Sequence, residues 1–215
     1  MASGKEPVGR EEPNRSTRKR MAILDAATEV FLRDGYLGTS MDEIAALSGV
    51  SKQTVYKQFA SKEALFIEIV SSLTTKTGDS VHTEIELEEG GDLSAYLQDY
   101  AYRQLSAVLT PRVMQLRRLV IGEVSRFPEL AKVLYERGPM RALTALATAF
   151  ERLAERGLLA IDDPMIAASQ FNWLIMSAPL NQAMLLGDEA IPTQAELRRH
   201  AADGVRVFLA AYGKQ

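Results

Sequence analysis

Five polar side chains in one short stretch, residues 52–58, have the chemistry to bind DNA. They are Lys52, Gln53, Thr54, Tyr56 and Lys57. The lysines can neutralise phosphate groups, the glutamine and threonine can pair with base edges, and the tyrosine can contact a phosphate or a thymine methyl group. Val55 and Phe59 are apolar at the spacing of one helix face. The stretch therefore predicts a short helix that is anchored on one side and polar on the other.

A second short helix is expected just before this stretch. Ser40 is a good amino-terminal cap, and Glu43 three residues later would complete a capping box. Ile44 and Leu47 are predicted to form its inward face. Gly49 then ends the helix, because glycine adopts the left-handed backbone conformation at little cost. Two short helices around such a turn are typical of a helix-turn-helix, whose second helix enters the DNA major groove.

An ordinary helical hairpin with a solvated face has the same spacing, so spacing alone favours neither interpretation. The residues from Thr39 to Phe66 are more specific, and they read T-S-M-D-E-I-A-A-L-S-G-V-S-K-Q-T-V-Y-K-Q-F-A-S-K-E-A-L-F. This run resembles the amino-terminal DNA-binding domain of TetR-family transcriptional regulators, and the resemblance covers roughly Arg18 to Val70. It departs at Gln53, where the family often has a small residue. Glutamine can pair with adenine, which makes this side chain a candidate base reader.

The resemblance implies further contacts to double-stranded DNA with a palindromic operator. Besides the five side chains above, the predicted set contains Arg18, Arg20, Thr39, Ser40 and Lys62. The two arginines belong to a basic cluster near the start of the first helix. Lys62 stands in the first turn of a fourth helix, where the helix dipole disfavours a cation. A phosphate at this position would remove the conflict, so we expect one there.

The composition indicates a globular protein without a catalytic or metal site. Of the 215 residues, 47% are hydrophobic and 25% are charged, and the net charge is −3. The chain has no cysteine, and its two histidines, His82 and His200, lack a metal-ligand spacing. No glycine-rich phosphate loop or Gly-x-Ser-x-Gly motif is present. We therefore expect no cofactor, no metal and no enzymatic activity.

The chain shows no feature that would direct it to a membrane. The amino terminus lacks the apolar core of a secretory signal. The longest apolar run, near Phe171 to Leu180, contains Asn172 and is too short to span a bilayer. We expect a cytoplasmic protein that does not act at a membrane.

The helix signals predict an all-α protein of about nine or ten helices. Residues 1–16 mix charges, glycine and proline without periodicity, and are expected to form a disordered basic arm. Residues 17–77 are expected to form a three-helix helix-turn-helix domain with a connecting helix. Residues 78–215 begin with an acidic, glycine-bearing connection and are expected to form a helical bundle for ligand binding and dimerisation.

Proline, glycine and capping residues mark the helix ends in the carboxy-terminal part. Asp163 and Pro164 are expected to begin a long helix. Thr193 and Glu196 form a capping box for the last helix. The Gly-Pro pair at 138–139 is expected to separate two helices.

The last two helices are more apolar than a small core requires. The last one has apolar residues at steps of four, three and four, which is the spacing of a coiled-coil seam. TetR-like proteins dimerise through the corresponding helices, so the resemblance implies a homodimer; the alternative is a bundle formed within one chain. The predicted interface consists of Phe171, Ile175, Ala201, Val205, Phe208 and Tyr212.

The middle helices are expected to surround a pocket for a small-molecule effector. The candidate lining residues are Tyr100, Arg103, Met114, Arg117, Phe127, Phe150, Asn172, Trp173 and Met176. Methionine and aromatic side chains form adaptable apolar walls, but the same residue types also fill ordinary cores.

The resemblance implies a repressor that releases its operator when a small molecule binds the carboxy-terminal domain, through coupling between two sites. The alternative is a DNA-binding protein without a small-molecule effector, which is controlled by a protein partner or is architectural. An internal cavity in the carboxy-terminal bundle would favour the first function, and a fully packed core would favour the second.

Overall fold

The computed structural model describes residues 14–82 and 87–214. Within these ranges the secondary structure is helical apart from one isolated antiparallel bridge between Leu159 and Gly213, which confirms the all-α prediction. No helix in the same ranges is long and apolar enough to cross a membrane. The chain divides into two compact units, Met1–Ile69 and Val70–Gln215. The predictions made for residues 1–13 lie outside the described residues.

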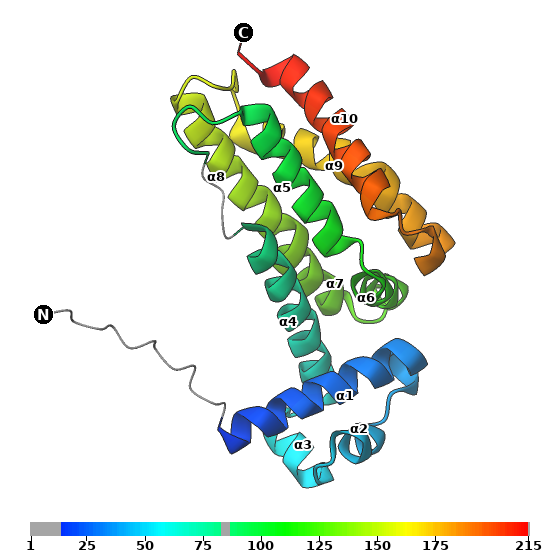
Figure 1. Cartoon of the computed structure of the whole chain (residues 1–215). Coiled ribbons are helices and arrows are strands. Elements are labelled where there is room, and N and C mark those ends of the chain that lie inside the picture. The colour runs from blue at the N-terminus through cyan, green and yellow to red at the C-terminus, as the bar shows by residue number, and fades with distance from the viewer. Residues whose placement is uncertain (1–13, 83–86, 215) are drawn as a thin grey trace, which may run out of the picture. The chain divides into compact units, whose positions relative to one another are not determined.

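The amino-terminal unit contains α1 (Arg15–Gly38), α2 (Met41–Ser48), α3 (Lys52–Gln58) and the start of α4 (Lys62–His82) (Figure 1). The side chain of Asn14 caps α1 by accepting a hydrogen bond from the backbone N–H of Thr17 at 2.9 Å. The helix therefore begins two residues before the predicted start, and the basic residues from Arg15 onwards belong to its first turns. Near its end, Gly35 interrupts the helical backbone with φ 75° and ψ 175°.

Aromatic side chains hold α1 against the start of α4. The ring centroids of Phe31 and Phe66 are 4.8 Å apart, and those of Tyr36 and Phe66 are 5.3 Å apart. The short α3 is attached to this core by Val55 and Phe59, which are both buried. The prediction that these two residues anchor α3 is confirmed.

The carboxy-terminal unit is a bundle in which α10 packs against α5 and α9, and α9 packs against α8 (Figure 1). Its α-helices are α5 (Leu93–Val108), α6 (Pro111–Gly122), α7 (Pro128–Tyr135), α8 (Arg141–Glu155), α9 (Pro164–Leu186) and α10 (Gln194–Tyr212). A π-helical turn, η1 (Glu136–Met140), joins α7 to α8, and a short 3-10 helix, η2 (Asp188–Ala190), follows α9.

The local signals for helix starts were correct in this unit. The carboxylate of Asp163 accepts hydrogen bonds from the N–H groups at the start of α9, with Met165 at 2.8 Å. Thr193 and Glu196 form the predicted capping box of α10. The Gly-Pro pair at 138–139 does not separate two helices, because the chain passes through it in the π-helical turn. A wider turn of this kind accommodates a proline, which has no N–H to give to the regular helix ladder.

Five of the six residues predicted for the dimer interface lie in the core of the single chain, and the sixth, Tyr212, is half-buried against it. Phe171, Ile175, Ala201, Val205 and Phe208 are at most 1% exposed, and the hydroxyl of Tyr212 donates to Gln170 at 2.5 Å. The rings of Phe171 and Phe208 are 5.0 Å apart, and both contact Phe150. A heptad-like seam identifies a buried stripe but not its partner. Five of these side chains therefore pack within one chain, and the homodimer itself stays a prediction.

Candidate DNA-binding surface and effector cavity

The turn between α2 and α3 has the geometry of a helix-turn-helix. Gly49 ends α2 with φ 68° and ψ 22°, in the left-handed region. The N–H of Val50 donates to the carbonyl of Ala45 at 3.2 Å, which closes the end of the helix. Ser51 then caps α3, accepting a hydrogen bond from the N–H of Thr54 at 3.2 Å. The predicted end of the first short helix at Gly49 is confirmed.

The predicted capping box at the start of α2 is not formed. The hydroxyl of Ser40 caps the N–H of Asp42 at 3.2 Å, while the carboxylate of Glu43 accepts from Arg33 of α1 and so does not complete a capping box. A charged partner on a neighbouring helix competes for the glutamate.

The inward face of α2 was only half correctly predicted. Ile44 is fully buried, but Leu47 is 49% exposed. Met41 and Ala45 are buried instead. Residues 41, 44 and 45 lie on one side of a helix, and Leu47 falls off that face because it is six residues from Met41.

The polar side chains predicted on α3 face solvent. Lys52, Gln53, Tyr56 and Lys57 are exposed, and Thr54 is half-buried. The ammonium of Lys52 lies 2.7 Å from a carboxylate oxygen of Asp42 on α2, and this hydrogen bond raises the pKa of Lys52. Both side chains are exposed, so the pair is weak and its lysine can turn to a phosphate.

The arginines predicted to bind DNA differ in their surroundings. Arg18 is exposed in the first turns of α1. Arg20 lies 3.0 Å from the carboxylate of Glu68, and its guanidinium carbon is 4.4 Å from the centre of the Phe59 ring. It also donates to the carbonyl of Gln58 at 3.4 Å. Arg20 therefore supports the end of α3, and a DNA contact would have to be made in addition.

Thr39 and Lys62 were also predicted to contact DNA, but both form hydrogen bonds within the amino-terminal unit. The hydroxyl of buried Thr39 donates to the carbonyl of Gly35 at 2.7 Å. The ammonium of Lys62 donates to the carbonyls of Tyr36 at 2.9 Å, Thr39 at 3.1 Å and Leu37 at 3.4 Å. A cation is favourable at the carbonyl end of a helix such as α1. The structure thus gives Lys62 a partner other than the predicted phosphate.

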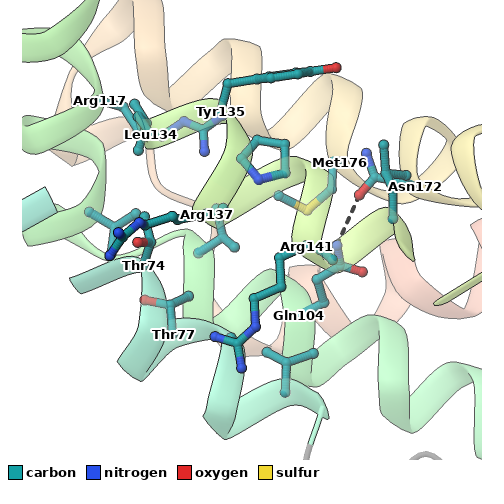
Figure 2. Close-up of a pocket in the computed structure, with 18 of the residues that line it drawn as sticks. Thr74, Thr77, Gln104, Arg117, Leu134, Tyr135, Arg137, Arg141, Asn172 and Met176 are labelled. Atoms are coloured by element: carbon teal, nitrogen blue, oxygen red, sulfur yellow. Dashed lines mark hydrogen bonds between the residues drawn. The ribbon is translucent and has the colours of Figure 1, made fainter. Parts of the chain in front are cut away.

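A cavity of about 340 Å³ lies within the carboxy-terminal unit (Figure 2). From α4 it is lined by Leu73, Thr74, Thr77, Gly78 and Val81, from α5 by Gln104 and Val108, from α6 by Val113, Leu116 and Arg117, from α7 to α8 by Leu134, Tyr135, Arg137, Gly138, Pro139, Arg141, Ala142 and Leu143, and from α9 by Ser169, Asn172, Trp173, Met176 and Leu180. Its size is within the range of small-molecule sites, about 300–1,000 Å³. The wall is mostly apolar, with a few polar groups that could orient a ligand.

Four of the nine predicted pocket residues line this cavity. These are Arg117, Asn172, Trp173 and Met176. The other five lie elsewhere: Tyr100, Met114 and Phe150 are buried in the core, Arg103 pairs with Asp99 at 2.9 Å, and Phe127 precedes α7. Apolar residues in the sequence look the same whether they meet a cavity or another side chain, which is why this separation needed the structure.

The sequence did not reveal that the segment 134–143 and α4 contribute to the cavity wall. The Gly-Pro pair in this segment predicts a break between helices, yet the π-helical turn places Arg137, Gly138 and Pro139 on the cavity wall. A proline within an otherwise helical pattern was the available signal, because π-helical turns often occur at functional sites.

The polar groups of the cavity wall have unequal surroundings. The amide of Gln104 donates to Asn172 at 2.9 Å, as the dashed line in Figure 2 shows, while its own Oε1 is buried without a hydrogen-bond partner. Arg141 pairs with Asp79 at 2.6 Å. Burial lowers the pKa of the Arg117 guanidinium. In the part of the chain that the structure describes, no cluster of His, Cys, Asp and Glu could hold a metal ion.

Comparison with known proteins agrees with this layout. Residues 23–69 match the model of bacterial regulatory proteins of the tetR family, and residues 95–214 match that of the AefR-like transcriptional repressor, C-terminal domain. A solved TetR-family transcriptional regulator from Mesorhizobium loti MAFF303099 is 41% identical, with a TM-score of 0.86, covering 94% of this chain and 100% of the other.

Two further relatives extend over most of the chain. The solved flavonoid-responsive regulator FrrA is 33% identical, with a TM-score of 0.77, covering 92% of this chain and 98% of the other. The HTH-type transcriptional regulator YhgD of Bacillus subtilis strain 168 is 26% identical over 80% of this chain and 93% of its own length. The chain belongs to the TetR family of DNA-binding transcriptional regulators.

Proposed function

We propose that this protein is a repressor that binds a palindromic operator as a homodimer and releases it when a small molecule occupies the cavity of the carboxy-terminal unit. The DNA-binding part of this proposal is carried by α3. Its apolar anchors are buried, while Lys52, Gln53 and Lys57 are exposed together on a helix short enough to enter the major groove. The lysines would contact phosphates, and the glutamine would read a base edge.

The small-molecule part rests on the cavity. Its volume of about 340 Å³ and its mostly apolar wall with a few polar groups are typical of a small-molecule site. The name of FrrA describes a regulator that responds to flavonoids, and it is 33% identical to this chain. Both observations support a small-molecule effector over control by a protein partner or an architectural function.

A second copy of the chain has an apolar surface available to it. Ile166, Trp173, Leu185 and Leu186 of α9 are each more than half exposed, and Val207 of α10 is 46% exposed. Large exposed apolar side chains on helices that pack together, as α9 and α10 do, are typical of an interface. A dimer would place two α3 helices about one DNA turn apart, roughly 34–36 Å, which is the spacing of palindromic half-sites.

Effector binding and DNA binding would be coupled through an equilibrium between two conformations of the protein, one that binds the operator and one that binds the effector. The chain passes directly from one unit to the other within α4, so a movement of residues 73–81 at the cavity can reach residues 62–69. Effector and operator must then weaken each other by the same factor.

The first experiment selects genomic fragments with the purified protein at moderate salt, followed by sequencing. Enrichment of one or a few inverted repeats is expected from a dimeric regulator, and the neighbouring genes would give candidate effectors. Titration of operator with and without such a compound then measures the coupling. Uniform recovery of fragments would contradict sequence-specific regulation, and independent binding of compound and operator would contradict effector control.

A further inference from the structure

The charged side chains on the cavity wall are all of one sign. Arg117, Arg137 and Arg141 line the cavity, and no aspartate or glutamate is among the described residues that do so. The chain as a whole has 28 acidic and 25 basic side chains, so a wall with three cations and no anion differs from its average surface. Cations in a largely apolar, partly enclosed space raise the local concentration of anions.

The three arginines are not equivalent. Arg141 is exposed and already paired with Asp79. Arg137 is exposed, so water solvates its charge. Arg117 is the one that other atoms enclose: its surface exposure is only intermediate, and burial alone accounts for the fall in its pKa. Arginine keeps its proton under such conditions, so a desolvated charge remains at this position.

Arg117 has no hydrogen bond or ion pair among the described residues. Its neighbour on α6 shows the contrast: Arg118 donates to the carboxylate of Asp188 at 2.5 Å and to the carbonyl of Ala183 at 3.0 Å. An enclosed guanidinium without a partner is costly, and an anion brought in by a ligand would remove that cost.

A second polar group of the cavity, the side chain of Gln104, would bind a hydrogen-bond donor instead of an anion. The Oε1 atom of Gln104 is buried and accepts no hydrogen bond, although its amide is held by Asn172. This oxygen suits a hydroxyl or N–H donor. The rest of the wall includes aliphatic and aromatic side chains such as Leu134, Tyr135 and Met176 (Figure 2).

We propose that the effector is an amphipathic organic anion: Arg117 binds its acidic group, Gln104 accepts a hydrogen bond from its hydroxyl or N–H, and the apolar wall encloses its body. This deepens the proposed function and rests on it. Arg117 thereby selects charged ligands over neutral ligands of the same shape, and Arg137 and Arg141 assist their entry.

The test uses two probes with the same ring system. 8-Anilinonaphthalene-1-sulfonate carries a sulfonate, and N-phenyl-1-naphthylamine is the same molecule without it. Both keep the N–H that would donate to Gln104, and both become fluorescent in apolar surroundings. Energy transfer from Trp173, which lines the cavity and is the single tryptophan of the chain, weights the signal towards probes near the site.

In the full-length protein, Arg117→Met should weaken binding of the sulfonate about tenfold to a hundredfold, the range expected for loss of hydrogen bonds to a charged group. Binding of the neutral probe should change less than about threefold. Arg117→Lys should recover part of the loss. Arg112→Met removes the same charge from an exposed position of α6 and should leave both affinities as they are.

Equal losses for the two probes, or no loss for the sulfonate, would overturn the assignment of Arg117, and so would a wild-type protein that prefers the neutral probe or binds neither. Thermal unfolding of Arg117→Met, with neutral-probe binding, shows whether the variant keeps its fold. If Arg117→Met unfolds, the affinities of Arg117→Lys and wild type for the two probes are compared instead. A loss confined to the sulfonate supports the assignment of Arg117, and equal or absent losses overturn it. Operator binding that is unaffected by a probe bound in the cavity would instead count against effector control, while leaving the anion site intact.

Discussion

The ammonium nitrogen of Lys62 lies 2.9 Å from the carbonyl oxygen of Tyr36 and 5.0 Å from the centre of the Tyr36 ring. Twenty-six residues separate the two in the chain, so the contact ties the start of α4 to the end of α1. The carbonyls that Lys62 contacts follow the non-helical residue Gly35 at the end of α1. Lys62 thus stabilises the junction that precedes α2 and α3.

Replacing Lys62 by alanine is therefore expected to destabilise the protein. Loss of hydrogen bonds to a charged group should lower the free energy of unfolding by about 1–3 kcal/mol. The salt dependence of DNA binding should stay close to that of the wild type. Urea unfolding and operator titrations at several salt concentrations measure both quantities, and a normal stability with a flatter salt dependence would show that Lys62 binds phosphate instead.

Lys57 provides the matched comparison, since it is exposed on α3. Lys57→Ala should leave the unfolding transition within about 0.5 kcal/mol of wild type, as is usual at the surface. It should weaken binding to all DNA and reduce the slope of log K against log salt by about 0.9, the value for one lost phosphate contact. An unchanged slope would exclude Lys57 from the interface.

Gln53→Ala should change sequence preference more than general affinity. A bidentate contact to a base is worth about 1–3 kcal/mol of discrimination, so binding to the operator should weaken by that amount while binding to random DNA stays nearly constant. Gln58→Ala is the control on the same helix, because the amide of Gln58 already donates to Ser16 of α1 at 3.4 Å. Competition between operator and random DNA makes the measurement, and equal losses on both would refute base reading by Gln53.

The pair between Lys52 and Asp42 is expected to hold DNA affinity below its maximum. Asp42→Asn releases the lysine and removes a negative charge from beside α3, so affinity should rise several-fold on any sequence and more at low salt. Stability should fall only slightly, since the pair is exposed, although the carboxylate stands in the first turn of α2. Glu129→Gln, which removes a first-turn carboxylate from α7, should not raise the affinity.

Asp188 should make the stability of the carboxy-terminal unit sensitive to acid. Its carboxylate accepts hydrogen bonds from Arg118 and Gln115 at 2.5 Å each, and the first of these holds its pKa below the usual value. Because the pKa is lower in the folded state, the stabilisation is complete above the unfolded-state value of about 3.9 and is lost as the pH falls through the folded-state value.

The corresponding variant tests this directly. Asp188→Asn should be less stable than wild type by about 1–3 kcal/mol at pH 7, because it leaves Arg118 with a neutral partner. The difference should persist down to about pH 4 and shrink below it. Denaturant unfolding across this pH range measures the difference, with the exposed neighbour Glu189→Gln as control; a difference that does not depend on pH would contradict the assignment.

Local chemistry made much of this fold predictable from the sequence. The left-handed turn at Gly49, the cap at Asp163 and the capping box of Thr193 with Glu196 each depend on residues within a few positions of one another. Such interactions act before and independently of tertiary packing. The polar face of α3 was predictable for the same reason, since a helix period of 3.6 residues places Val55 and Phe59 on one side.

Tertiary packing decided the features that join distant residues. The sequence showed that Phe171 and Phe208 are apolar at helical spacing, but only the bundle determined that they pack on each other and not on a second copy. Lys62 could be recognised as a cation at a helix start, but its carbonyl partners come from the kinked end of α1. The cavity follows the same rule: its wall comes from six separate helices, α4 to α9, and the π-helical turn, and whether an apolar side chain fills space or borders it depends on the volume left by all the others.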